Sequence, residues 1–249
     1  AQDEFTDYDF EGSGMSVLLD VLAYNTHYLG FNANMVANEM FLDSASLRSS
    51  IVSHAKTLGY VPSSARAAKA TVDVTLNTNS STATMPAGTV FSTTVGDTTF
   101  QFSTIEAFTK SNTGNSIPFV GVDIYEGTFI TTRYTVDSSD IDQRFLLTDN
   151  RADTSTLIVK VQTSSTDSTS TTFTEATDIT QVTAGSNVFF LQEVEAGLFE
   201  VYFGDGVIGT ALSDDNIVIL TYVVSNKSAA NGASLFTNVA SIASVTDIS

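Results

Sequence analysis

The chain is organised around a helical block near its N-terminus, which contains the run Met15-Ser16-Val17-Leu18-Leu19-Asp20-Val21-Leu22-Ala23-Tyr24. Apolar residues recur there every three or four positions, which is the spacing of one helix face. The additional apolar residues between them widen this face beyond an ordinary stripe. Two more periodic runs, within 31–42 and 47–58, predict a second and a third helix, so that the three helices can cover one another.

The boundaries of this block are predicted from capping residues. Ser13 and Ser44 stand where N-cap hydroxyls would accept the first free amides of the first and third helices. Gly59 followed by Pro62 is a helix stop signal. We therefore expect a compact three-helix block over residues 1–62.

From residue 63 onward the sequence favours strands. Val72, Val74 and Leu76 alternate with polar residues, which is the pattern of a half-buried strand, and 111–116 is rich in Asn, Gly and Ser and predicts a linker. Apart from Asp167, the tract 163–172 contains only Ser and Thr, which predicts an exposed flexible loop. Further strands are expected at 89–91, 99–102, 129–134, 144–147, 157–161, 188–191, 199–203 and 217–224.

The predicted fold class is therefore α+β, with an N-terminal three-helix block followed by a mainly antiparallel β domain that carries an inserted β unit. The predicted domains are 1–62 for the helical block, 63–109 together with 190–249 for a discontinuous β domain, and 110–189 for the inserted unit.

Composition excludes several classes of partner and chemistry. The 249 residues include 28 acidic and 10 basic ones, so the formal net charge of -18 repels phosphate backbones and anionic membranes. No apolar run reaches the length that crosses a bilayer. The absence of cysteine removes disulfides, thiol nucleophiles and thiolate metal sites. Because the first residue is not Met and no signal pattern follows, we expect the ordered part of a longer chain.

A glycine motif at 204–209, Gly-Asp-Gly-Val-Ile-Gly, matches the dinucleotide-binding pattern and follows a predicted strand. That pattern needs a helix whose N-terminus faces the pyrophosphate. Only 210–216 separate the glycines from the next predicted strand, so there is no room for such a helix. We predict no cofactor and interpret the motif as a structural turn formed by Gly204, Asp205, Gly206 and Gly209.

No catalytic or metal-binding set stands out. His27 and His54 lie on predicted helices without a histidine four residues away. Asp137, Asp140 and Asp142 lack the spacing and glycine of a calcium loop, and a solvated turn is the favoured interpretation. We predict that the protein is not an enzyme, has no metal site and has no small-molecule substrate.

Two parts of the chain resemble known families. The run from Tyr8 to Thr26, with Leu47-Arg48-Ser49-Ser50 and Gly59-Tyr60-Val61-Pro62, resembles the N-terminal signature of baseplate wedge subunits from T-even-type contractile-tailed bacteriophages. The run Phe203-Gly204-Asp205-Gly206, followed by 217–222 and Asn231-Gly232, resembles the signature of the broader baseplate J-like family, in which it is a structural element.

The resemblance implies a structural subunit of a phage tail baseplate wedge. It implies a ring around the central hub, contacts with copies of itself and with other wedge proteins, rearrangement on tail contraction, and a virion location after assembly in the host cytoplasm. Neither nucleic acid nor membrane is expected as a partner. A β-rich adhesin or receptor-binding module is the alternative, and a glycan-degrading enzyme is a third possibility.

The helical block offers more apolar surface than three short helices can cover. The surplus side chains would meet either the β domain or another subunit, and the resemblance favours a shared interface over packing within the domain. Leu47 and Ile51 are instead expected in the internal seam of the block. The candidate interface residues are Tyr24, Tyr28, Phe31, Met35, Met40 and Phe41.

Overall fold

The computed structural model describes residues 14–140 and 143–249. The chain divides into two compact units, with the boundary between Val61 and Pro62, and each unit is described by itself. The predicted N-cap Ser13 and the third member of the acidic cluster, Asp142, lie outside the described residues.

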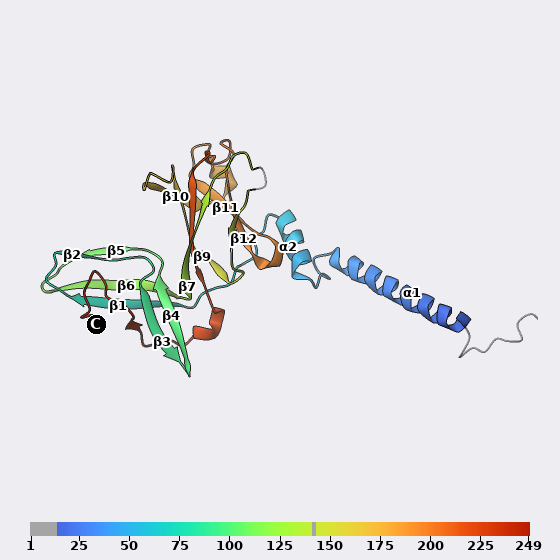
Figure 1. The fold of residues 1–249 in the computed structure, drawn as a ribbon, viewed down its shortest axis with the longest axis horizontal. Helices are drawn as coiled ribbons and strands as arrows, with labels where there is room; N and C mark the ends of the chain where they lie inside the picture. Colours follow the sequence, from blue (N-terminus) through green and yellow to red (C-terminus); the bar gives the residue numbers. More distant parts are fainter. Residues whose placement is uncertain (1–13, 141–142) are drawn as a thin grey trace, which may run out of the picture. The chain divides into compact units, whose positions relative to one another are not determined.

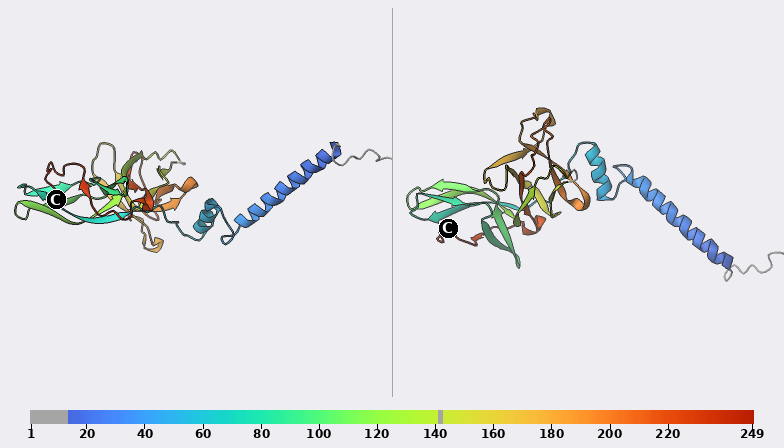
Figure 2. Two further views of the ribbon diagram at one scale, coloured as in Figure 1. Left: turned by 90° about the horizontal axis from the view of Figure 1, so that it is seen from below. Right: turned by 45° about the horizontal axis from the view of Figure 1, so that its top comes forward.

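From residue 14 onward the first unit contains two α-helices, α1 (Gly14–Glu39) and α2 (Arg48–Thr57). Helix α1 is a single unbroken helix in every view (Figures 1 and 2). Its 26 residues contain no proline, and the interior Gly30 costs about 1 kcal/mol relative to alanine without ending a helix. The first and second predicted helices are therefore one element.

The predicted fold class is wrong in this respect, because two α-helices replace the three-helix block and the described residues are mostly strand. Apolar residues recur along two sides of α1 from Met15 to Val36, so periodicity gave no sign of a break near residue 31. The predicted cap at Ser44 is also wrong. Helix α2 has Leu47 at its N-cap position, and the Ser44 hydroxyl donates to the carbonyl of Asn38 at 2.7 Å.

The described part of the second unit contains strands and three short 3-10 helices. The alternation of Val72, Val74 and Leu76 lies in β1, and the continuous apolar run at 217–224 is β13. The strands are β1 (Lys69–Asn77), β2 (Thr82–Met85), β3 (Val90–Val95), β4 (Thr98–Thr104), β5 (Phe108–Ser111), β6 (Ser116–Glu126), β7 (Thr128–Thr135), β8 (Phe145–Leu147), β9 (Ala152–Gln162), β10 (Ser170–Glu175), β11 (Val188–Glu193), β12 (Phe199–Phe203), β13 (Ile217–Val224) and β14 (Thr237–Asn238); the 3-10 helices are η2 (Ile179–Gln181), η3 (Glu195–Gly197) and η4 (Lys227–Ala230).

These strands form three sheets. A five-stranded sheet has the order β1-β6-β4-β3-β14, a seven-stranded sheet has the order β7-β13-β9-β10-β11-β12-β8, and β2 pairs with β5. Of the described pairs only β10 and β11 are parallel. Strand β13 lies between β7 and β9 and is buried at seven of its eight positions, which explains its continuous apolar sequence.

Each large sheet has its own apolar core. The core of the five-stranded sheet includes Phe91, Phe102 and Phe119, and that of the seven-stranded sheet includes Leu220 and Tyr222. Sheet membership changes between Glu126 and Thr128, where β6 leads into β7, and again after Val224, beyond which the chain returns to the first sheet. The predicted domain boundaries, near residues 110 and 190, stay a prediction about folding units.

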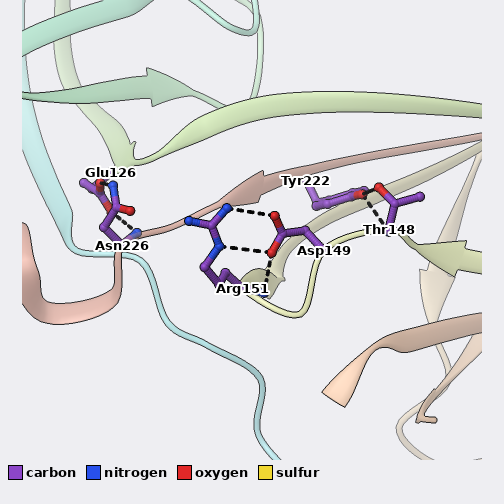
Figure 3. Close-up of polar contacts among 6 residues, drawn as sticks. All are labelled: Glu126, Thr148, Asp149, Arg151, Tyr222 and Asn226. Carbon is purple, nitrogen blue, oxygen red and sulfur yellow. Dashed lines mark hydrogen bonds and ion pairs between the residues drawn. The ribbon is translucent and has the colours of Figure 1, made fainter. Parts of the chain in front are cut away.

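A polar joint connects the two large sheets at these crossings (Figure 3). The Glu126 carboxylate is buried and accepts hydrogen bonds from the backbone and side-chain amides of Asn226, both at 2.8 Å. Asp153 accepts a hydrogen bond from the backbone amide of Ala67 at 2.8 Å. Gly127 has a φ of 127°, and a Cβ there would lie 2.2 Å from the Val224 carbonyl oxygen. The joint therefore rests on satisfied polar groups and on a glycine that leaves no space for a side chain.

Two further contacts shown in Figure 3 fix the strands beside this joint. Arg151 forms an ion pair with Asp149 at 2.9 Å. The hydroxyl oxygen of Tyr222, a fully buried residue of β13, lies 3.1 Å from both the amide nitrogen and the hydroxyl of Thr148. The buried phenol therefore has partners for its polar atom, as a tyrosine in a core requires.

Candidate subunit interface

Helix α1 has no buried residue in this chain. All six candidate interface side chains lie on or just after it, with exposed fractions between 38% for Met35 and 65% for Phe41. Large apolar side chains exposed together along a helix indicate a surface that another helix or subunit covers. The assignment of these six residues to a subunit interface stays a prediction.

The apolar residues of α1 form two seams, each with the alternating spacing of four and three that suits helix-to-helix packing. The second seam is displaced from the first by two residues, about 200° at roughly 100° per residue, so the seams lie on nearly opposite sides of the helix. The first seam consists of Val17, Val21, Tyr24, Tyr28, Phe31 and Met35, and the second of Met15, Leu19, Leu22, Thr26, Leu29, Ala33 and Val36.

Only Tyr24, Tyr28, Phe31 and Met35 of these seam residues were among the candidates predicted from sequence. The second seam could have been found from its spacing in the sequence, because all its members except Thr26 are apolar. Within the first seam, the rings of Tyr24 and Tyr28 are 4.5 Å apart. A hydrogen bond with Tyr28 raises the pKa of Tyr24 above its usual value.

Glu39, the last residue of α1, connects this helix to α2. Its carboxylate accepts hydrogen bonds from the Ser46 hydroxyl at 2.7 Å, the Ser46 amide at 2.9 Å and the Leu47 amide at 3.2 Å. These bonds, together with one from the Ser50 side chain, lower the pKa of Glu39 to about 2. An acidic group at the start of a helix also interacts favourably with the helix dipole. Glu39 thus fixes the segment that leads into α2, whereas the N-cap position itself, Leu47, makes no side-chain cap bond.

A second contact fixes the same corner. The Nε2 atom of His54, on α2, lies 2.9 Å from the backbone carbonyl oxygen of Glu39. An open groove of about 530 Å³ lies between the end of α1 and the start of α2. Leu47 lines this groove, which is otherwise formed by Asn32, Met35, Val36, Glu39, Met40 and Ser50.

The predicted internal seam of the helical block is wrong. Leu47 and Ile51 are exposed, whereas Val52 and Ala55 are the buried residues of α2. Without a third helix, the face of α2 that carries Leu47 and Ile51 is left uncovered in this unit. These two residues therefore join the apolar surface that requires a partner.

The glycine motif at 204–209 forms a tight loop between β12 and β13. The Asp205 carboxylate accepts hydrogen bonds from the amides of Val207 at 2.9 Å and Ile208 at 3.0 Å. Gly206 and Gly209 have φ values of 86° and 83°, and a Cβ at Gly204 would lie 2.1 Å from the carbonyl oxygen of Ile208. Residues 210–216 continue as a bridge and turns into β13, with no helix facing the glycines.

The remaining candidate residues lie apart. His27 is on α1 and its ring lies 6.1 Å from that of Tyr28, while Asp137 accepts hydrogen bonds from the amide and hydroxyl of Ser139. Over 14–140 and 143–249, no three His, Asp or Glu side chains are placed to hold a metal ion. No helix in the same ranges combines the length and apolar character needed to cross a membrane.

Comparison with known proteins supports one class, the wedge proteins of the phage tail baseplate. Residues 1–60 match the family described as "Baseplate wedge protein gp6-like, helical domain". Over 267 aligned residues the chain is 28% identical to baseplate wedge protein gp6 of Enterobacteria phage T4, and the match covers 99% of this chain and 39% of that protein. The chain thus spans about two fifths of the length of this relative.

These matches confirm the predicted location in the baseplate of a phage tail and support a structural role. Neither match names the baseplate J-like family, so the second resemblance stays a prediction.

Proposed function

We propose that this chain is a structural, non-enzymatic subunit of a baseplate wedge that joins a ring around the central hub. It contacts copies of itself and other wedge proteins, and these contacts rearrange when the tail contracts. Nucleic acid, membranes and small-molecule substrates are not among its partners. The observation that carries the proposal is the full exposure of α1, whose two apolar seams find no cover within their own unit.

The seams are large enough to drive association. Burial of a large apolar side chain contributes about 1.5–3 kcal/mol, so the six residues of the first seam contribute roughly 9–18 kcal/mol when fully covered. The loss of translational and rotational freedom on association costs about 4–15 kcal/mol. Burial of one seam therefore roughly balances the cost of one association, and the second seam serves a second association.

The position of the seams also supports more than one contact per copy. Because they lie on nearly opposite sides of α1, a single neighbouring helix can cover one seam only. Repeated contacts of this kind are what a closed ring requires of each subunit. The groove beside Leu47 adds apolar surface at the end of α1. A shift of a helix packed in this groove would be one of the movements by which subunit interfaces rearrange.

The experiment compares Phe31→Ala with Asn34→Ala, which removes a polar side chain from the same helix. Sedimentation velocity should show that Phe31→Ala shifts the protein toward smaller species, and electron microscopy should show loss of ring-like particles. Both variants should keep the melting temperature of the second unit. Equal assembly of the two variants would contradict an interface on the first seam, and absence of rings from mixtures of all wedge proteins would contradict the ring.

A further inference from the structure

A second apolar surface lies on the outer face of β11 and β12, far along the chain from α1. In β11, Phe189 and Leu191 point into the core, so Val188 and Phe190 point outward. Phe190 pairs with Tyr202 across the strands, and their rings stack 5.2 Å apart. Tyr202 is 43% exposed, so the stacked pair presents an aromatic face to solvent.

The β12–β13 loop extends this surface. Gly209 lies against Val188, since a Cβ at Gly209 would be 3.1 Å from a methyl group of that valine. At the loop tip, Val207 is 73% exposed and Ile208 is 42% exposed. We define the docking surface as Val188, Phe190, Tyr202, Val207 and Ile208.

The loop holds its apolar tip in one conformation. Within the loop, Gly206 donates a hydrogen bond to the Gly209 carbonyl, and Asp205 accepts the two bonds described above. Two more bonds tie it to the neighbouring segment, from the Gly209 amide to Thr183 at 3.1 Å and from the Thr210 amide to Ser186 at 2.9 Å. A surface that is already ordered loses little entropy when a partner binds.

The charge of the segments beside the docking surface identifies the kind of partner, because the cation on the same outer face, Arg144, is already paired with Glu200 at 2.8 Å. Segments 175–187 and 204–216 contain five acidic residues, Glu175, Asp178, Asp205, Asp214 and Asp215, and no Lys or Arg. Hydrogen bonds from Thr180 to Asp178 and from the Ile208 and Val207 amides to Asp205 keep the pKa of both carboxyl groups below the usual range. At this surface the acidic segments of a second copy would be repelled, whereas Lys and Arg on a different protein would be attracted.

We infer that the docking surface binds a different protein chain, one that presents an apolar patch framed by Lys and Arg. The stacked aromatic pair and the loop tip would supply the apolar centre of the interface, and the acidic segments its polar rim. This inference rests on the proposed function, because it makes the partner another protein of the assembled tail. It assigns a second interface to the chain, separate from the seams of α1.

The test places a photo-crosslinking amino acid at Val207 of the full-length protein in the phage that encodes it. A matched variant carries the same group at Val120, an exposed residue of β6 in the other sheet. After irradiation of purified tails, mass spectrometry should identify at position 207 a cross-linked peptide from another protein, with Lys or Arg flanking the attachment point. Adding Tyr202→Asp to the Val207 variant should reduce this product at least tenfold without changing the melting temperature.

Each outcome decides the inference. A cross-link to a second copy of this chain, a cross-link to an acidic peptide, or no product above that of the Val120 variant would overturn it. A product that survives Tyr202→Asp unchanged would remove the stacked pair from the interface and overturn it as well. If the chain is absent from purified tails, the proposed function itself fails. If the chain is present in tails but gives no cross-link at position 207, only the inferred contact fails.

Discussion

Replacement of Gly127 by alanine tests whether the joint between the two sheets depends on close backbone approach. The new Cβ would stand 2.2 Å from the Val224 carbonyl oxygen and 2.8 Å from a methyl group of Val223, so the β6–β7 crossing must shift. Overpacking of this kind costs about 1–3 kcal/mol, and a non-glycine residue at a φ of 127° adds roughly 1–3 kcal/mol. The expected loss is therefore about 2–6 kcal/mol, a large part of the roughly 5–15 kcal/mol that stabilises a typical protein.

Gly96→Ala is the matched control, because Gly96 also has a positive φ, 59°, but has no atom within 4 Å of an added Cβ. It should lose only about 1 kcal/mol, the cost of an alanine in the left-handed region. Urea unfolding followed by circular dichroism would give both values, with the slope of the transition checked for a change in cooperativity. If the two variants differed by less than about 0.5 kcal/mol, the argument from close approach would be refuted.

Three further predictions concern Glu39, Tyr222 and the loop at 163–169. The folded pKa of Glu39, about 2, lies below the usual value of about 4.3, so its contribution to helix stability is present above pH ~4.3 and is lost as the pH falls toward 2. Glu39→Gln should remove this part of the pH dependence, so the difference in helicity between wild type and variant should shrink from pH 5 to pH 2. A difference that stays constant over this range would contradict the role of Glu39. Tyr222→Phe leaves Thr148 without its buried partner and should cost about 1–3 kcal/mol in thermal unfolding, whereas wild-type stability would show that water replaces the hydroxyl. Limited proteolysis of the folded chain should cut first at 163–169, the exposed connection between β9 and β10, and earlier cleavage within β13 would refute the order of local stability.

The strands were more predictable from sequence than the helices. In β1 the alternation of Val72, Val74 and Leu76 indicates a strand with one buried face. The continuous apolar run of β13 indicates a central strand that is buried on both faces. In α1 the pattern marks no limit, because apolar residues recur without interruption from Met15 to Val36 and continue with Met40 and Phe41 beyond the end of the helix. Gly30 sits in open space and interrupts nothing.

Caps and sheet membership could not be predicted because they depend on residues distant in the chain. The segment before α2 is held by Glu39, eight residues before the N-cap position Leu47, while the nearer Ser44 bonds backward to Asn38. Strand β6 pairs with β1 although four other strands lie between them in the sequence. Strand β13 inserts between β7 and β9, and both are too far from it in the sequence for a local pattern to reveal the pairing. The docking surface was missed because Phe190 and Tyr202 meet only through the pairing of β11 with β12.

The return of the chain to the first sheet also sets an order for synthesis on the ribosome. The edge of β3 is completed by β14, and β1 donates backbone hydrogen bonds to the carbonyls of Asp247 and Ser249. Both contacts join segments that are translated before and after the entire seven-stranded sheet. The nascent five-stranded sheet therefore waits with open edges while more than a hundred residues emerge, and long-range pairing of this kind is slow and exposed to aggregation. A chaperone, or early capture of α1 by a partner, would act during this interval and would favour correct closure over edge-to-edge association.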